Sequence, residues 1–181
     1  MKNALIFGGT GMLAGMSKCL LRTPNIQHSL GESTKMARLS QSNEKSDCRA
    51  VVLDYQNTEA LRMHVCESIR KFGAIDIVIA WIHSTAPDAI PTIFTEICNN
   101  QSEPWRFIHI KGSSHHLPSI ERKAVTPDNC LYREVQLGFK LEGGISRWLT
   151  HNEISNGVIE AIKADANKAV IGTLEPWEKR P

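Results

Sequence analysis

The residues best suited to bind a ligand form a glycine-rich stretch near the start of the chain. A nucleotide pyrophosphate needs a tight turn, a backbone that approaches it closely and a helix N-terminus with available amides. Gly8 suits the turn, Gly11 leaves room beside the phosphate, and Ala14 suits close packing of the helix on a strand. This pattern predicts a pyrophosphate-binding loop, with a non-binding glycine turn as the alternative. The stretch consists of Gly8, Gly9, Thr10, Gly11, Met12, Leu13 and Ala14.

Such a loop needs a strand before it and a helix after it, and apolar patterning predicts both, at 2–7 and 12–21. Because strands and helices then alternate, we expect an α/β fold of Rossmann type. This is a doubly wound, mostly parallel sheet with helices on both faces, in a single domain of residues 1–181. The further strands are expected at 25–30, 49–53, 75–82, 105–110, 131–141 and 168–172. The further helices are expected at 34–39, 57–72, 150–163 and from either 85 or 88 to 99.

Local signals set several of these boundaries. Asn57 or Thr58 is expected to cap a helix that Gly73 ends, and Thr150 with Glu153 forms a capping box. Gly143 and Gly144 predict a turn. Residues 111–129 show little amphipathic pattern and predict a long loop, with one short helical turn at 119–123.

Composition excludes several classes of partner. The 21 basic and 19 acidic residues are interspersed, so no basic stripe exists for nucleic acid or an anionic membrane surface. No segment reaches the ~18 apolar residues of a membrane span. Five scattered cysteines without a CxxC pair indicate reduced thiols in a cytoplasmic protein, not disulfides, and no metal site is expected.

The chain resembles the short-chain dehydrogenase/reductase family. Residues 4–14, ALIFGGTGMLA, look like its first strand and glycine loop, and 75–83, IDIVIAWIH, look like its fourth strand. Asp54 and Tyr55 stand where that family places an aspartate near the adenine ring. The resemblance implies a bound NAD or NADP. The cofactor-binding residues it implies are Gly8, Gly9, Thr10, Gly11, Met12, Leu13, Glu32, Asp54, Tyr55, Ala80, Trp81 and Ile82.

Selectivity between the two nicotinamide cofactors is usually set at the end of the second strand. Glu32 stands there and suits the ribose hydroxyls of NAD, whereas Lys35 suits the 2′-phosphate of NADP. We expect a preference for NAD. The alternative for both residues is an ordinary charge on an exposed segment.

The chain departs from the family at the residues that carry catalysis. The family's Tyr-x-x-x-Lys motif is absent, because Tyr55 is followed four residues later by Glu59 and Tyr132 by Gln136. Without a lysine beside it, Tyr132 is expected to pack its ring, with a role as proton donor as the alternative. The fourth strand leads into Trp81, Ile82 and His83 in place of an Asn-Ala-Gly motif.

Other polar residues at the strand ends are therefore the candidates for catalysis. An imidazole titrates near neutral pH, so His83 is a candidate acid or base, with a structural histidine as the alternative. Lys111 is a candidate contact to the nicotinamide ribose or a substrate anion, or else a surface lysine. Ser113 and Ser114 stand near the family's catalytic serine.

Two functions remain open at this point. The first is an NAD(P)-dependent oxidoreductase that transfers hydride to or from a small carbonyl or alcohol substrate with a non-standard proton donor. The alternative is a non-catalytic dinucleotide-binding sensor or partner-binding module. The expected ligand besides the cofactor is a small-molecule substrate, and a homo-oligomer is left open.

Overall fold

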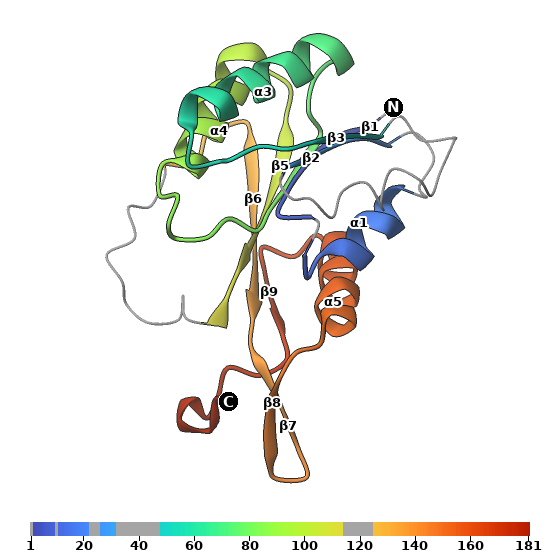
Figure 1. The fold of residues 1–181 in the computed structure, drawn as a ribbon, viewed down its shortest axis with the longest axis vertical. Coiled ribbons are helices and arrows are strands. Elements are labelled where there is room, and N and C mark those ends of the chain that lie inside the picture. Colours follow the sequence, from blue (N-terminus) through green and yellow to red (C-terminus); the bar gives the residue numbers. More distant parts are fainter. Residues whose placement is uncertain (1, 10, 22–25, 32–47, 114–124) are drawn as a thin grey trace.

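The computed structural model of the chain describes residues 2–9, 11–21, 26–31, 48–113 and 125–181 (Figure 1). Its centre is a seven-stranded sheet in the order β3-β2-β1-β4-β5-β6-β9, and every neighbouring pair is parallel. This confirms the predicted Rossmann-type sheet. The strands are β1 (Lys2–Phe7), β2 (Ile26–Gly31), β3 (Cys48–Val51), β4 (Ile77–Ala80), β5 (Trp105–Lys111), β6 (Cys130–Leu137) and β9 (Lys168–Ile171).

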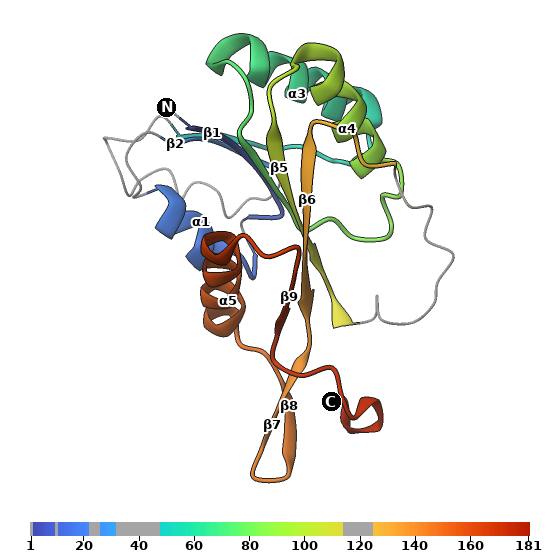
Figure 2. The same ribbon diagram turned by 180° about the vertical axis from the view of Figure 1, so that it is seen from behind.

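Helices cover both faces of this sheet (Figures 1 and 2). Helices α3 (Thr58–Phe72) and α4 (Ala89–Asn100) lie on one face, and α1 (Ala14–Leu21) and α5 (His151–Ala164) lie on the other. Alternate strand residues point to opposite faces, so the core is divided into two hydrophobic clusters. None of the described helices is long and apolar enough to cross a lipid bilayer.

The predicted helix boundaries hold where local signals set them. The Asn57 side chain accepts a hydrogen bond from the Ala60 amide at the start of α3, and Gly73 ends that helix with a φ of 87°. The capping box of Thr150 and Glu153 opens α5 as expected. The predicted helix at 34–39 and the turn at 119–123 lie outside the described residues.

The prediction of one strand over residues 131–141 is wrong. β6 ends at Leu137, and β7 (Phe139–Glu142) instead pairs with β8 (Ile145–Trp148) in an antiparallel hairpin. At Gly138 a Cβ atom would lie 2.0 Å from the Thr173 carbonyl oxygen, and Phe139 and Thr173 form an antiparallel bridge, so two distant chain segments lie in direct contact there. The hairpin, which projects beyond the sheet in Figure 1, turns at Gly143 and Gly144, whose φ angles are 58° and 82°.

Gln101 joins α4 to the segment before β4 through its side chain. The buried amide accepts a hydrogen bond from the Ile75 N–H at 2.7 Å and donates to the Ile75 carbonyl at 2.9 Å. One glutamine therefore satisfies both backbone groups of a buried residue next to a central strand.

Replacing Gln101 with alanine is expected to lower the free energy of unfolding by about 1–3 kcal/mol, because it leaves buried backbone groups at Ile75 without partners. Urea unfolding measures this loss. The control is Gln56→Ala, since Gln56 is exposed and its removal is expected to change stability by less than about 0.5 kcal/mol. Equal losses in the two variants would contradict the assigned role.

Candidate functional site

The glycine-rich loop lies at the point where the strand order of the sheet reverses. From β1 the sheet continues to β2 and β3 on one side, and to β4 and the later strands on the other (Figure 1). Open α/β sheets bind ligands at the carboxyl ends of the strands at such a point. The loop that follows β1 is thus placed where a ligand is expected.

Gly8 is required by the packing of the chain itself. Its φ is +76°, and a Cβ atom there would lie 2.5 Å from the Trp81 carbonyl oxygen. The Trp81 amide also donates a hydrogen bond to the Phe7 carbonyl at 3.0 Å. The ends of β1 and β4 are held together here, and only glycine fits between them.

Gly11 differs from Gly8, because no contact with the residues that the structure describes explains its lack of a side chain. It is exposed, and a Cβ atom built on it meets nothing within 4 Å. The space beside Gly11 is open, as the approach of a phosphate requires. Packing within the chain therefore explains the glycine at position 8, whereas the glycine at position 11 leaves space open for a ligand.

The start of α1 packs against α5. A Cβ on Gly15 would lie 2.9 Å from Ser155 Oγ, so the two helices approach closely at Gly15. The Leu13 side chain is fully buried, so only its backbone faces a ligand. Gly15 and Ser155 are residues of this site that the sequence pattern did not indicate, since the contact joins distant segments.

The other predicted cofactor residues differ in how far they are exposed. Asp54 is exposed and accepts a hydrogen bond from the Gln56 amide, whereas the Tyr55 ring is only 7% exposed within the core under α3 and α4. Ala80 and Ile82 are buried, and Trp81 packs against the opposite cluster. Thr10 and Glu32 lie outside the described residues.

The predicted catalytic residues are spread along the carboxyl edge of β4 and β5. His83 is exposed after β4, and its carbonyl accepts a hydrogen bond from the Ala86 amide. Ser113 is half-buried after β5. Lys111 forms an ion pair with Glu134 Oε2 at 3.0 Å, so it is not an isolated surface lysine. Ser114 lies outside the described residues.

β5 and β6 carry a row of paired polar side chains on the face that α3 and α4 cover in part. His109 Nδ1 and Tyr132 Oη are hydrogen-bonded at 2.6 Å, and the Tyr132 ring stacks on Phe107. Towards the carboxyl edge, Glu134 also contacts Lys168 Nζ at 3.2 Å, and Gln136 donates to the Gly112 carbonyl. His109 was not among the predicted site residues, although the alternation of polar residues along both strands indicates this row.

The charges of Lys111 and Lys168 keep the Glu134 carboxyl group of this row ionised to a lower pH than usual. Burial acts to raise the pKa of Glu134, but the hydrogen bond and charge of Lys111, followed by those of Lys168, hold it below the ordinary 4.5. A lowered folded-state pKa contributes stability above the unfolded-state pKa, and this is lost as the pH falls through the folded-state value.

Glu134→Gln is therefore expected to be less stable than the wild type at pH 7. The difference in stability between the two proteins is expected to become smaller below about pH 4. Thermal unfolding at pH 7 and pH 3 measures it. Glu160→Gln is the control, because the exposed Glu160–Lys163 pair should contribute little at either pH. A gap that widens in acid would contradict the sign of the shift.

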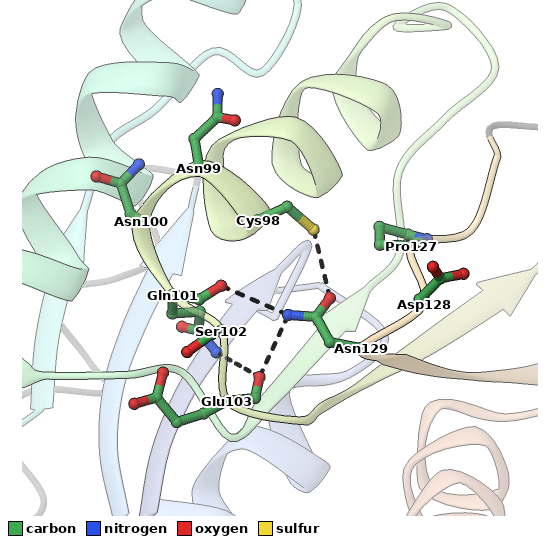
Figure 3. Close-up of a pocket in the computed structure, with 9 residues that line it drawn as sticks. All are labelled: Cys98, Asn99, Asn100, Gln101, Ser102, Glu103, Pro127, Asp128 and Asn129. Carbon is green, nitrogen blue, oxygen red and sulfur yellow. Dashed lines mark hydrogen bonds between the residues drawn. The ribbon is translucent and has the colours of Figure 1, made fainter.

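A hollow of about 810 Å³ lies at the opposite, amino-terminal edge of the sheet (Figure 3). Its polar groups largely bond one another: Asn129 donates to the carbonyls of Gln101 and Glu103 and accepts from the Cys98 thiol. Among the described residues, no three His, Cys, Asp or Glu side chains gather in a way that would hold a metal ion. These hydrogen bonds connect the end of α4 to the residue before β6, so the polar groups of the hollow have a structural role.

No protein-family profile and no curated protein sequence matches the chain. The fold, in contrast, has many relatives among solved structures. A short-chain dehydrogenase/reductase from Serratia marcescens has a TM-score of 0.67 at 15% identity over 95% of this chain and 96% of that one. An alcohol dehydrogenase from the archaeon Thermococcus sibiricus, complexed with 5-hydroxy-NADP, has a TM-score of 0.68 at 14% identity over 96% of each chain.

A 3-oxoacyl-[acyl-carrier protein] reductase from Brucella melitensis is similar to the same degree, with a TM-score of 0.66 at 15% identity over 96% of this chain and 97% of that chain. These likenesses extend over nearly the whole chain. The predicted resemblance is thus confirmed at the level of architecture, and the chain has the Rossmann-type fold of the short-chain dehydrogenase/reductases.

Proposed function

We propose that the chain binds a nicotinamide dinucleotide at its glycine-rich loop. The observation that carries this proposal is the contrast between two glycines: packing requires Gly8, whereas Gly11 faces open space. A glycine that touches no other described segment, at the switch point of a parallel sheet, fits a site that the pyrophosphate fills. The 5-hydroxy-NADP complex of the Thermococcus enzyme supports the same cofactor class.

Gly11→Glu is expected to abolish dinucleotide binding while leaving the melting temperature unchanged, because the new carboxylate would occupy the open space and repel the pyrophosphate. Titration with NADH and NADPH, followed by nicotinamide fluorescence, measures binding and also the expected preference for NAD. Gly11→Ala controls for size alone, since a methyl group adds no charge. Undiminished binding by Gly11→Glu would place the dinucleotide elsewhere.

We further propose an NAD(P)-dependent oxidoreductase acting on a small carbonyl or alcohol substrate. The bound nicotinamide supplies or accepts the hydride, and the protein must supply or accept one proton at the substrate oxygen. Tyr132 and His109 are the described pair best arranged to do so, because their side chains share a 2.6 Å hydrogen bond. His109 lies in register with Ala80, the last residue of β4, close to the carboxyl edge.

In this proposal Tyr132 Oη gives its proton to the carbonyl oxygen, and the imidazole of His109 passes a proton back to it. Lys111, held by Glu134, lies nearer the edge and orients an anionic or polar group of the ligand. His83 and Ser113 remain the alternative donors, since both follow strands at the same edge. The ligand besides the cofactor is then a small molecule.

Tyr132→Phe is expected to slow carbonyl reduction about 100-fold without changing NADH affinity, because only the transferable proton is removed. The assay is NADH consumption with a panel of small aldehydes and ketones. His83→Ala is the comparison, and a loss confined to His83→Ala would make that residue the donor. If NADH binds but no carbonyl oxidises it, the non-catalytic dinucleotide-binding function takes its place.

A further inference from the structure

Helix α5 contacts the glycine-rich loop through one buried hydroxyl. Ser155 is 3% exposed, and its Oγ donates a hydrogen bond to the Met12 carbonyl at 3.1 Å, across 143 residues of sequence. The two helices approach closely enough for this bond because Gly15 carries no side chain. Ser155 of α5 therefore contacts the glycine-rich loop, which follows the first strand of the chain.

This hydrogen bond fixes the direction of one peptide group. In a planar trans peptide the C=O and the following N–H point in opposite directions. Because the Met12 carbonyl points to α5, the Leu13 N–H points away from α5. Leu13 directly precedes α1, so its amide is among the first N–H groups, which lie outside the helix's own hydrogen-bond ladder. Amides of this kind bind phosphate.

A second buried serine acts on the same loop from within α1. Ser17 is fully buried, and its Oγ donates to the Gly9 carbonyl at 2.9 Å. Two carbonyls of the loop are thus turned inward by hydroxyl groups. Ser17 is local to the loop and its helix, whereas Ser155 makes the loop depend on a separate element.

α5 is itself held on both sides of Ser155. In its first turn, Glu153 caps the helix and contacts Arg147 at 2.9 Å and Lys140 at 2.8 Å, both on the β7–β8 hairpin. Hydrogen bonds from Arg147 and then Lys140 hold the pKa of the Glu153 carboxyl far below its ordinary value. After Ser155, Gly157 lies directly against Ile171 of β9.

We propose that Ser155 is a positioning residue for the dinucleotide site, and that it holds the Met12–Leu13 peptide so that the Leu13 amide faces the pyrophosphate. The inference rests on the proposed function, because it assigns the loop to a dinucleotide. It adds α5, and through α5 the hairpin, to the elements that determine cofactor affinity.

The test compares Ser155→Ala with Ser68→Ala, which removes a similarly buried hydroxyl from α3 on the opposite face of the sheet. Ser155→Ala is expected to raise the Kd for NADH about five- to tenfold, the effect of one lost hydrogen bond. Ser68→Ala is expected to leave that Kd unchanged. Melting temperatures of both variants show whether the affinity change follows general destabilisation.

A second variant moves the hydroxyl without deleting it. Gly15→Ala places a methyl group 2.9 Å from Ser155 Oγ and should displace it from Met12, even though alanine favours the helix. It is expected to weaken NADH binding, and combining it with Ser155→Ala should add little, because both changes break one contact. If the losses of NADH affinity in the two single variants add up in the double variant, the two changes do not act through the same Ser155–Met12 contact, and the proposal is wrong.

Amide hydrogen exchange at Leu13 gives a readout that needs no ligand. Faster exchange in Ser155→Ala than in Ser68→Ala is expected. If the wild type binds NADH and Ser155→Ala binds it equally well, the positioning role is wrong while the proposed function stands. If the wild type binds neither NADH nor NADPH, the proposed function fails, and exchange at Leu13 then decides only whether Ser155 orders the loop.

Discussion

The close approach between Gly8 and the Trp81 carbonyl is the constraint on which the site depends. β1 and β4 are neighbours although β2, β3 and α3 separate them in sequence, and the sheet reverses its order between them. A side chain at Gly8 would separate the two strand ends. The Phe7–Trp81 hydrogen bond would then be lost, and the glycine-rich loop would no longer start at the switch point.

The two faces of the sheet carry different polar contacts near the Gly8–Trp81 approach. On one face, α1 and α5 surround the loop, and buried hydroxyls of Ser17 and Ser155 orient its carbonyls. On the other face, α3 and α4 bury the apolar half of β5, and the remaining side chains pair as His109–Tyr132 and Lys111–Glu134. The serine contacts to the glycine-rich loop and the His109–Tyr132 pair thus lie in opposite layers of one fold.

Features set by local sequence were predictable, whereas those set by distant contacts were not. The strand at 2–7, the Asn57 cap and the Thr150 capping box each depend on a few adjacent residues, and the structure agrees with all three. The hairpin after Leu137 was missed because the chain there contacts Thr173, which is distant in sequence. The Ser155–Met12 contact likewise leaves no local pattern.

The missing Tyr-x-x-x-Lys spacing has a physical consequence once Tyr132 is placed on a strand. In a helix, residues four apart are neighbours on one face, but along a strand they are about 13 Å apart. A lysine at position 136 would therefore not reach the Tyr132 hydroxyl. Adjacent strands are only about 4.8 Å apart, so a tyrosine in a sheet must take its partner from the next strand. Phe107 lies directly across from Tyr132 on β5, and the Tyr132 hydroxyl bonds His109, two residues further along that strand, so a tyrosine–histidine pair forms without the helical motif.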